Sequence, residues 1–108
     1  MPSTKAYLDY ISEQLSGLDD VRFRPMMGEY LLYYCDRLAG GIYDDRLLVK
    51  PVPSALKMMP GAPKEIPYEG AKEMLLVKEV DNREFLCELL QVMWPELPDR
   101  KKKTRSRH

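Results

Sequence analysis

Arg22 and Arg24 are the residues whose type and spacing point most directly to chemistry. They alternate with Val21 and Phe23 in a segment that reads as a half-buried strand, so both arginines lie on one face of it. Two guanidinium groups on one face favour an anion site; cross-strand ion pairs or a solvated face are the structural alternative. The two arginines therefore mark a candidate small-molecule or enzymatic site, together with the strand that carries Gly40-Gly41.

The sequence shows no pair of residues that could form an activated nucleophile. The single histidine is His108, in the basic C-terminal segment, whereas a Ser–His or Cys–His pair needs a histidine beside the nucleophile. Gly40-Gly41 lacks the spacing of a phosphate-binding glycine loop. Cys35 and Cys87 form no C-x-x-C motif, so we predict two reduced thiols. The expectation is a protein with no catalytic residue, no metal site and no cofactor.

Paired aspartates occur at Asp19-Asp20 and Asp44-Asp45. A metal or acid–base role would need convergent partners that a sequence cannot show. Aspartate tolerates the positive φ that tight hairpins require, so we interpret both pairs as turn residues.

Short strands and tight turns must position these side chains. Strands are predicted over 21–24, 29–35, 38–43, 46–50 and 74–77, from their apolar and aromatic content and their bounding turn residues. The turns fall at Met26-Met27-Gly28, Asp36-Arg37 and Asp44-Asp45. Pro25 indicates a strand end or an edge, and the glycine pair indicates a bulge or the close approach of another group.

Helices are predicted on either side of the strands. The first begins at Ser3 or Thr4 and places an apolar face at i, i+3/i+4 spacing. A short helix over 54–59 precedes a loop over 60–70. Asp81 and Glu84 resemble a capping box that opens a last helix, which Pro95 ends. No βαβ repeat is present, so the fold class is α+β: a twisted antiparallel sheet of about five strands with helices packed on it.

Composition is typical of one soluble domain. The chain has 108 residues, of which 44% are hydrophobic, and it contains no apolar run of membrane-spanning length. Residues 1–99 hold 11 Lys or Arg and 17 Asp or Glu, a net charge of −6, while residues 100–108 hold six basic residues and no acid. We predict a domain over 1–98 and a disordered basic tail over 99–108. Without a signal peptide, the expected compartment is the cytoplasm.

Tyrosine and methionine provide a candidate protein-interaction surface. If both faces of strand 29–35 carry apolar side chains, one face is covered by helices and the other needs a partner or a lid. For the methionines, gap-filling in the core is the alternative. The candidate residues are Arg22, Arg24, Met26, Met27, Tyr30, Tyr33, Tyr34 and Tyr43.

The basic tail is a candidate contact for nucleic acid. Its charge would give salt-dependent affinity for phosphates without sequence readout, and a solubilising tail is the alternative. No aromatic residue is interleaved for stacking on bases. The basic residues are Arg100, Lys101, Lys102, Lys103, Arg105 and Arg107.

Several segments together resemble the N-terminal domain of the TfoX/Sxy family, bacterial regulators of natural competence. The resemblance covers most of residues 5–98. It rests on Arg24 to Tyr34, Gly40 to Asp44, Leu47 to Pro51, Pro67 to Lys72 and Met74 to Val77. It implies a fold similar to the secretion chaperones and supplies no catalytic residues. The competence regulators add a helical C-terminal domain, which residues 99–108 do not resemble.

Three functions follow as hypotheses. The first is a non-enzymatic, cytoplasmic regulatory module that binds an unknown protein partner or a second copy of itself and influences transcription. The second is a nucleic-acid-associated protein that uses the basic tail. The third is a small-molecule or enzymatic domain near Arg22 and Arg24.

Overall fold

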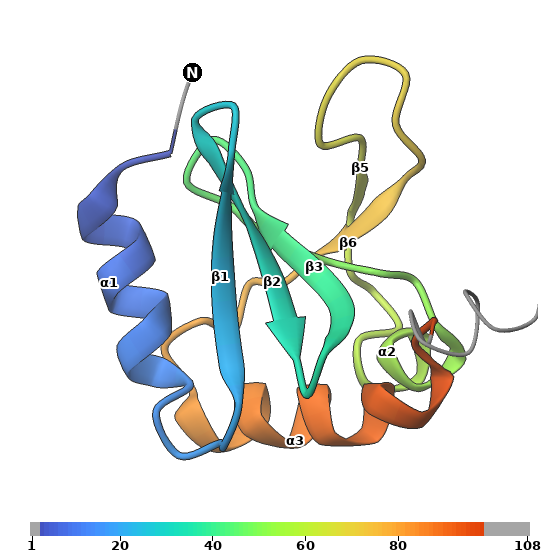
Figure 1. Cartoon of the computed structure of the whole chain (residues 1–108). Helices are drawn as coiled ribbons and strands as arrows, with labels where there is room; N and C mark the ends of the chain where they lie inside the picture. Colours follow the sequence, from blue (N-terminus) through green and yellow to red (C-terminus); the bar gives the residue numbers. More distant parts are fainter. Residues whose placement is uncertain (1–2, 99–108) are drawn as a thin grey trace, which may run out of the picture.

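A computed structural model describes residues 3–98 and consists of one six-stranded antiparallel sheet with its helices (Figure 1). The helices are α1 (Lys5–Gln14), α2 (Pro53–Met58), α3 (Arg83–Met93) and a short 3-10 helix, η1 (Trp94–Glu96). The strands are β1 (Val21–Met26), β2 (Glu29–Tyr34), β3 (Arg37–Ile42), β4 (Leu47–Val49), β5 (Lys64–Glu65) and β6 (Met74–Leu76). The strand order is β1-β2-β3-β4-β6-β5, which confirms the α+β fold class.

Three two-residue turns connect the first four strands. Their central residues all have positive φ: 52° and 87° at Met27-Gly28, 48° and 68° at Cys35-Asp36, and 53° and 56° at Asp44-Asp45. This is the type I′ geometry, whose twist matches that of the paired strands. The predicted turn at Asp36-Arg37 was wrong by one residue, because Tyr34 pairs with Arg37 and leaves Cys35-Asp36 as the loop.

A bulge interrupts the pairing of β2 with β3. Leu32 pairs with Gly40 and Tyr33 with Leu38, so Ala39 is the extra residue. Ala39 is fully buried in the core. The glycine pair therefore follows a bulge, as the sequence predicted.

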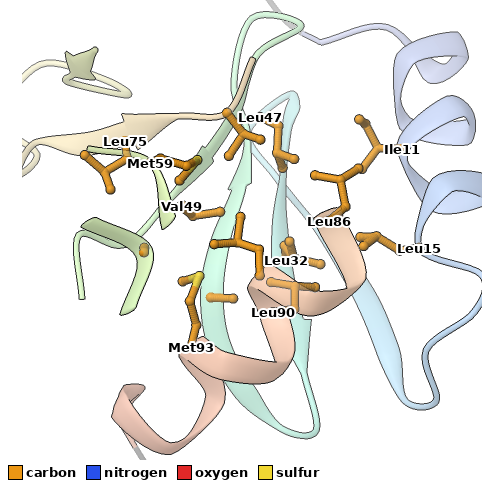
Figure 2. Packing of buried hydrophobic residues seen from close by; sticks show 14 of the residues in the cluster. Ile11, Leu15, Leu32, Leu47, Val49, Met59, Leu75, Leu86, Leu90 and Met93 are labelled. Carbon is orange, nitrogen blue, oxygen red and sulfur yellow. The ribbon is translucent and has the colours of Figure 1, made fainter. Parts of the chain in front are cut away.

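The core lies between one face of the sheet and the helices (Figure 2). Helix α1 contributes Ile11 and Leu15, and α3 contributes a face that includes Leu86 and Met93. The α2 segment contributes Ala55, so all three α-helices pack against the same cluster. Consequently one face of the sheet is covered by the three α-helices, and none of these three packs on the other face (Figure 1).

The segment before β6 differs from the prediction. It contains β5, a two-residue strand whose Lys64 pairs with Leu75. A strand this short carries no alternation of apolar and polar residues, so the sequence had no signal for it. The predicted tail over 99–108 lies outside the described residues.

Asn82 caps helix α3. Its side-chain oxygen accepts a hydrogen bond from the Phe85 backbone N–H at 3.0 Å. The cap therefore lies one residue after the predicted Asp81, whose carboxylate instead accepts a hydrogen bond from the Tyr10 hydroxyl. Helix α3 provides four buried residues, so the stability of its first turn affects the packing of the core.

We expect Asn82→Ala to lower the free energy of unfolding by about 1 kcal/mol, since the Phe85 N–H loses its acceptor. Urea denaturation followed by circular dichroism measures this. Asn82→Asp is the matched control, because aspartate is an equally good cap and its charge suits a helix N-terminus. Equal losses in both variants would contradict the capping role.

Candidate functional site

The strand register decides which side chains face the helices and which face outward. Val21 pairs with Tyr34 and Phe23 with Leu32, and these residues pack against the core. Residues opposite each other in an antiparallel pair share a face. Arg22, paired with Tyr33, therefore lies on the face away from the helices, which we call the open face.

The predicted interaction residues divide between the two faces. Tyr30 and Tyr34 pack against the helix-side core and contribute little to an outer surface. Met27 is 96% exposed at the tip of the first turn. The other five lie on the open face, on strands β1 and β2 or just after β3: Arg22, Arg24, Met26, Tyr33 and Tyr43.

The two arginines have separate contacts on this face. Arg22 forms an ion pair with Asp20, whose Oδ1 lies 3.1 Å from Arg22 Nε. Both side chains are well exposed, so the pair contributes little stability. The guanidinium of Arg24 lies 6.0 Å from the centre of the Tyr33 ring, a cation–π arrangement. The two guanidinium groups thus do not converge on one anion site.

A groove of about 700 Å³ hollows the other half of the open face. Its floor includes Leu31, Leu38 and Gly40 from the central strands. The loop between β5 and β6, which projects from the body of the domain in Figure 1, forms one wall through residues such as Tyr68 and Lys72. A small-molecule site has typically about 300–1,000 Å³ and a mainly apolar lining, and this groove meets both conditions.

Neither Arg22 nor Arg24 lines this groove. Of the residues in the predicted small-molecule site, only Gly40 lines the groove. The lining residues at the end of β4 and beyond are Lys50, Pro51 and Val52, and the C-terminal segment adds Glu96 and Pro98.

Tyr43 forms an aromatic wall of the groove. Its ring lies over Gly41, where an added Cβ would come within 2.8 Å of the ring. The absence of a side chain at Gly41 makes room for the ring, which agrees with the predicted close approach. The Tyr43 and Tyr68 ring centres are 6.1 Å apart and tilted by 53°. Burial is the main cause that raises the pKa of Tyr43, so its hydroxyl stays neutral at pH 7.

Two lysines, Lys50 and Lys72, line the groove, together with two acids, Glu73 and Glu96. Burial lowers the pKa of the half-buried Lys50 ammonium, and the nearby charge of Lys72 lowers this pKa further. Within residues 3–98, neither ammonium has a hydrogen-bond or ion-pair partner. A negative charge beside the half-buried Lys50 ammonium would therefore be favourable.

The two acids that line the groove do not supply that charge. Glu96 accepts hydrogen bonds from the Ser54 N–H at 2.8 Å and the Ser54 hydroxyl at 2.7 Å. The hydroxyl bond is the largest cause that lowers the pKa of Glu96. Glu73 is exposed and forms no ion pair with either lysine.

The paired aspartates act in turns. Asp45 accepts a hydrogen bond from the Thr4 backbone N–H at 2.8 Å and so connects the third turn to the start of α1. Likewise, the Glu29 carboxylate accepts a hydrogen bond from the Ser3 hydroxyl at 2.6 Å. Among residues 3–98, no group of three or more His, Cys, Asp or Glu side chains has the arrangement of a metal site. Both free cysteines, Cys35 and Cys87, are half-buried.

Sequence reasoning missed Lys50, Lys72 and Tyr68 because the groove joins segments that are distant in the chain. One signal was available in β4. Leu47, Leu48 and Val49 are all buried although neighbouring residues in a strand point to opposite faces. A run without alternation indicates that both faces are covered there. The candidate contacts for nucleic acid, residues 100–107, lie outside the described chain.

Fold and groove together define a small α+β domain with one helix-covered sheet face and one open, partly hollowed face. No family model matches the chain, and no solved structure matches it. A similar protein from Spirochaeta aurantia, described as "Uncharacterized 12.7 kDa protein in trpE 5'region", is 29% identical over 110 residues. The matched region covers 98% of this chain and 96% of that relative. In residues 3–98, no helix is long and apolar enough to cross a membrane.

Proposed function

We propose that the protein is a non-enzymatic regulatory module that binds a protein partner through the open face over β1 and β2. The proposal includes a cytoplasmic location and an influence on transcription, as the resemblance to the N-terminal domain of the TfoX/Sxy family implies. The basic tail is not required for this function.

One observation carries the proposal: on β1 and β2 an exposed arginine lies over a half-buried tyrosine, and the turn between these strands carries an exposed methionine. Arg24 lies over the Tyr33 ring, and the adjoining turn presents Met27 almost fully exposed. Arginine, aromatic residues and methionine are enriched in the central part of protein interfaces. The stacked pair restricts two long side chains before a partner arrives, so binding loses less conformational entropy.

The edge position of β1 supports the same surface. It has a hydrogen-bonded neighbour on only one side, β2. An edge strand can accept a strand from a partner, although Pro25 removes one backbone donor from this edge. Side chains of the open face would then set the specificity of the contact.

We expect Arg24→Ala and Tyr33→Ala each to reduce partner capture from the native cytoplasm about tenfold, the effect of losing a residue at the centre of an interface. The measurement is affinity capture with quantitative mass spectrometry. Tyr10→Ala is the matched control, because Tyr10 is an exposed tyrosine on helix α1, on the helix-covered side. Unchanged capture by both open-face variants would refute the proposal.

A further inference from the structure

We propose that the groove between the open face and the β5–β6 loop binds a small carboxylic acid with an aromatic or branched apolar body. Its carboxylate would lie between the ammonium groups of Lys50 and Lys72. This inference goes beyond the proposed partner surface: Met26 and Leu31 of β1 and β2 border both, whereas Arg24 and Tyr33 do not line the groove, so variants at Arg24 and Tyr33 test the partner surface separately.

Charge complementarity is the first argument. Lys50 and Lys72 line the same groove, the charge of Lys72 disfavours the half-buried Lys50 ammonium, and neither has a partner within residues 3–98. Two like charges at a partly dry surface are costly unless an anion lies between them. A bound carboxylate removes that cost and forms two charge-assisted hydrogen bonds.

The lining indicates the body of the ligand. Apart from the two lysines and the acids Glu73 and Glu96, the groove is formed mainly by the apolar floor and the tyrosine wall. Tyr43 is 4% exposed and Tyr68 is 53% exposed, so the Tyr68 ring, braced against Tyr43, offers most of the aromatic surface to a further planar group. A volume of about 700 Å³ suits a molecule of one or two rings.

The groove favours a ligand with a single negative charge. A phosphate monoester would bring almost two negative charges into an apolar groove, and its desolvation would cost more than that of a carboxylate. Glu73 on the lining repels every negative charge of a ligand, so it opposes a dianion about twice as strongly as a monoanion. Among residues 3–98, no arginine lines the groove to give the bidentate contacts that favour phosphate.

The basic segment that follows Pro98 does not suit the groove. Residues 100–108 carry six Lys or Arg and no acid, so their side chains supply no anion for Lys50 and Lys72. A separate anionic molecule is the occupant that fits the charge.

Binding of 2-naphthoate to the full chain, measured by isothermal titration calorimetry, tests the proposal. We expect a Kd of about 1 mM or tighter, within the range for a ligand of this size. The uncharged isostere 2-naphthamide and the more highly charged 2-naphthyl phosphate should each bind at least about tenfold more weakly, because one lacks the anion and the other is overcharged. Equal or tighter binding of either analogue would overturn the proposal.

Lysine variants locate the site. Lys50→Met and Lys72→Met should each weaken 2-naphthoate binding about tenfold, whereas Lys5→Met should leave it unchanged. Lys5 is the matched control, since it is an exposed lysine on the helix-covered side. Lys72 is exposed in a loop, so its variant stays informative even if Lys50→Met impairs folding. Full binding by the Lys72 variant, or amide NMR shifts that avoid the β5–β6 loop, would refute the assignment.

Discussion

Gly40→Ala is expected to lower the free energy of unfolding by about 3 kcal/mol or more, because the added methyl group has no space in the sheet. A Cβ at Gly40 would overlap the carbonyl oxygen of Leu48 and lie 2.7 Å from the Cα of Val49. These are backbone atoms of the paired strand β4, so no side-chain rotation can relieve the overlap. The strands would have to separate where Leu48 and Val49 hold the sheet together.

Thermal unfolding followed by circular dichroism measures this effect, with an expected fall in Tm of more than about 10 °C for a domain of this size. Gly61→Ala is the matched control, since nothing lies within 4 Å of an added Cβ there and its φ is not positive. That control should be neutral or stabilise by up to about 1 kcal/mol, because alanine restricts the unfolded chain. A Gly40 variant as stable as the Gly61 variant would contradict the close pairing of β3 with β4.

Local sequence patterns were sufficient for most of the fold. Aspartate pairs predict positive φ, and Asp44-Asp45 adopts it at a two-residue turn. Alternation predicts that Phe23 faces the core and Arg24 faces away, and the register confirms this. Each of these features depends on residues within one or two positions of each other, so a single sequence is enough to predict it.

The groove could not be predicted, since it depends on how distant segments meet. Tyr43 and Tyr68 are 25 positions apart, and the loop that carries Tyr68 has no apolar periodicity. Lys50 reads as an ordinary polar strand end, and only the tertiary structure places it near Lys72. The Gly41–Tyr43 spacing was the nearest local hint, because a glycine two residues before an aromatic residue on one strand face leaves room for the ring.

The bulge at Ala39 shows how one irregular residue affects both halves of the sheet. It shifts the register, so that Arg37 reaches the helix side of the sheet, and there its guanidinium lies 3.9 Å from the centre of the Trp94 ring. Arg37 also donates a hydrogen bond to the Trp94 carbonyl at 2.9 Å. Further along the same strand, Gly40 lines the groove. Strand β3 therefore positions both the end of helix α3 and the floor of the groove.

Leu86→Ala is expected to lower the free energy of unfolding by about 2–5 kcal/mol, through lost burial and the cavity that remains. Leu86 is 1% exposed on α3 and lies near Ile11 and Leu15 of α1 (Figure 2). A domain of this size has a total stability of about 5–15 kcal/mol, so the loss is a large fraction of it. The sheet and both long helices meet at this side chain, and they cannot all move inward to fill the space.

Urea denaturation with Leu56→Ala as control separates the cavity from the simple loss of a leucine. Leu56 lies on α2 with 39% of its surface exposed, so its truncation should cost only about 1 kcal/mol or less. Leu86→Met, which nearly conserves volume, should cost less than about 1.5 kcal/mol. Similar losses for Leu86→Ala and Leu56→Ala would mean that α3 does not pack on the sheet through this residue. The distinction between a helix-covered face and an open face would then lose its support. Both proposed binding surfaces depend on that distinction.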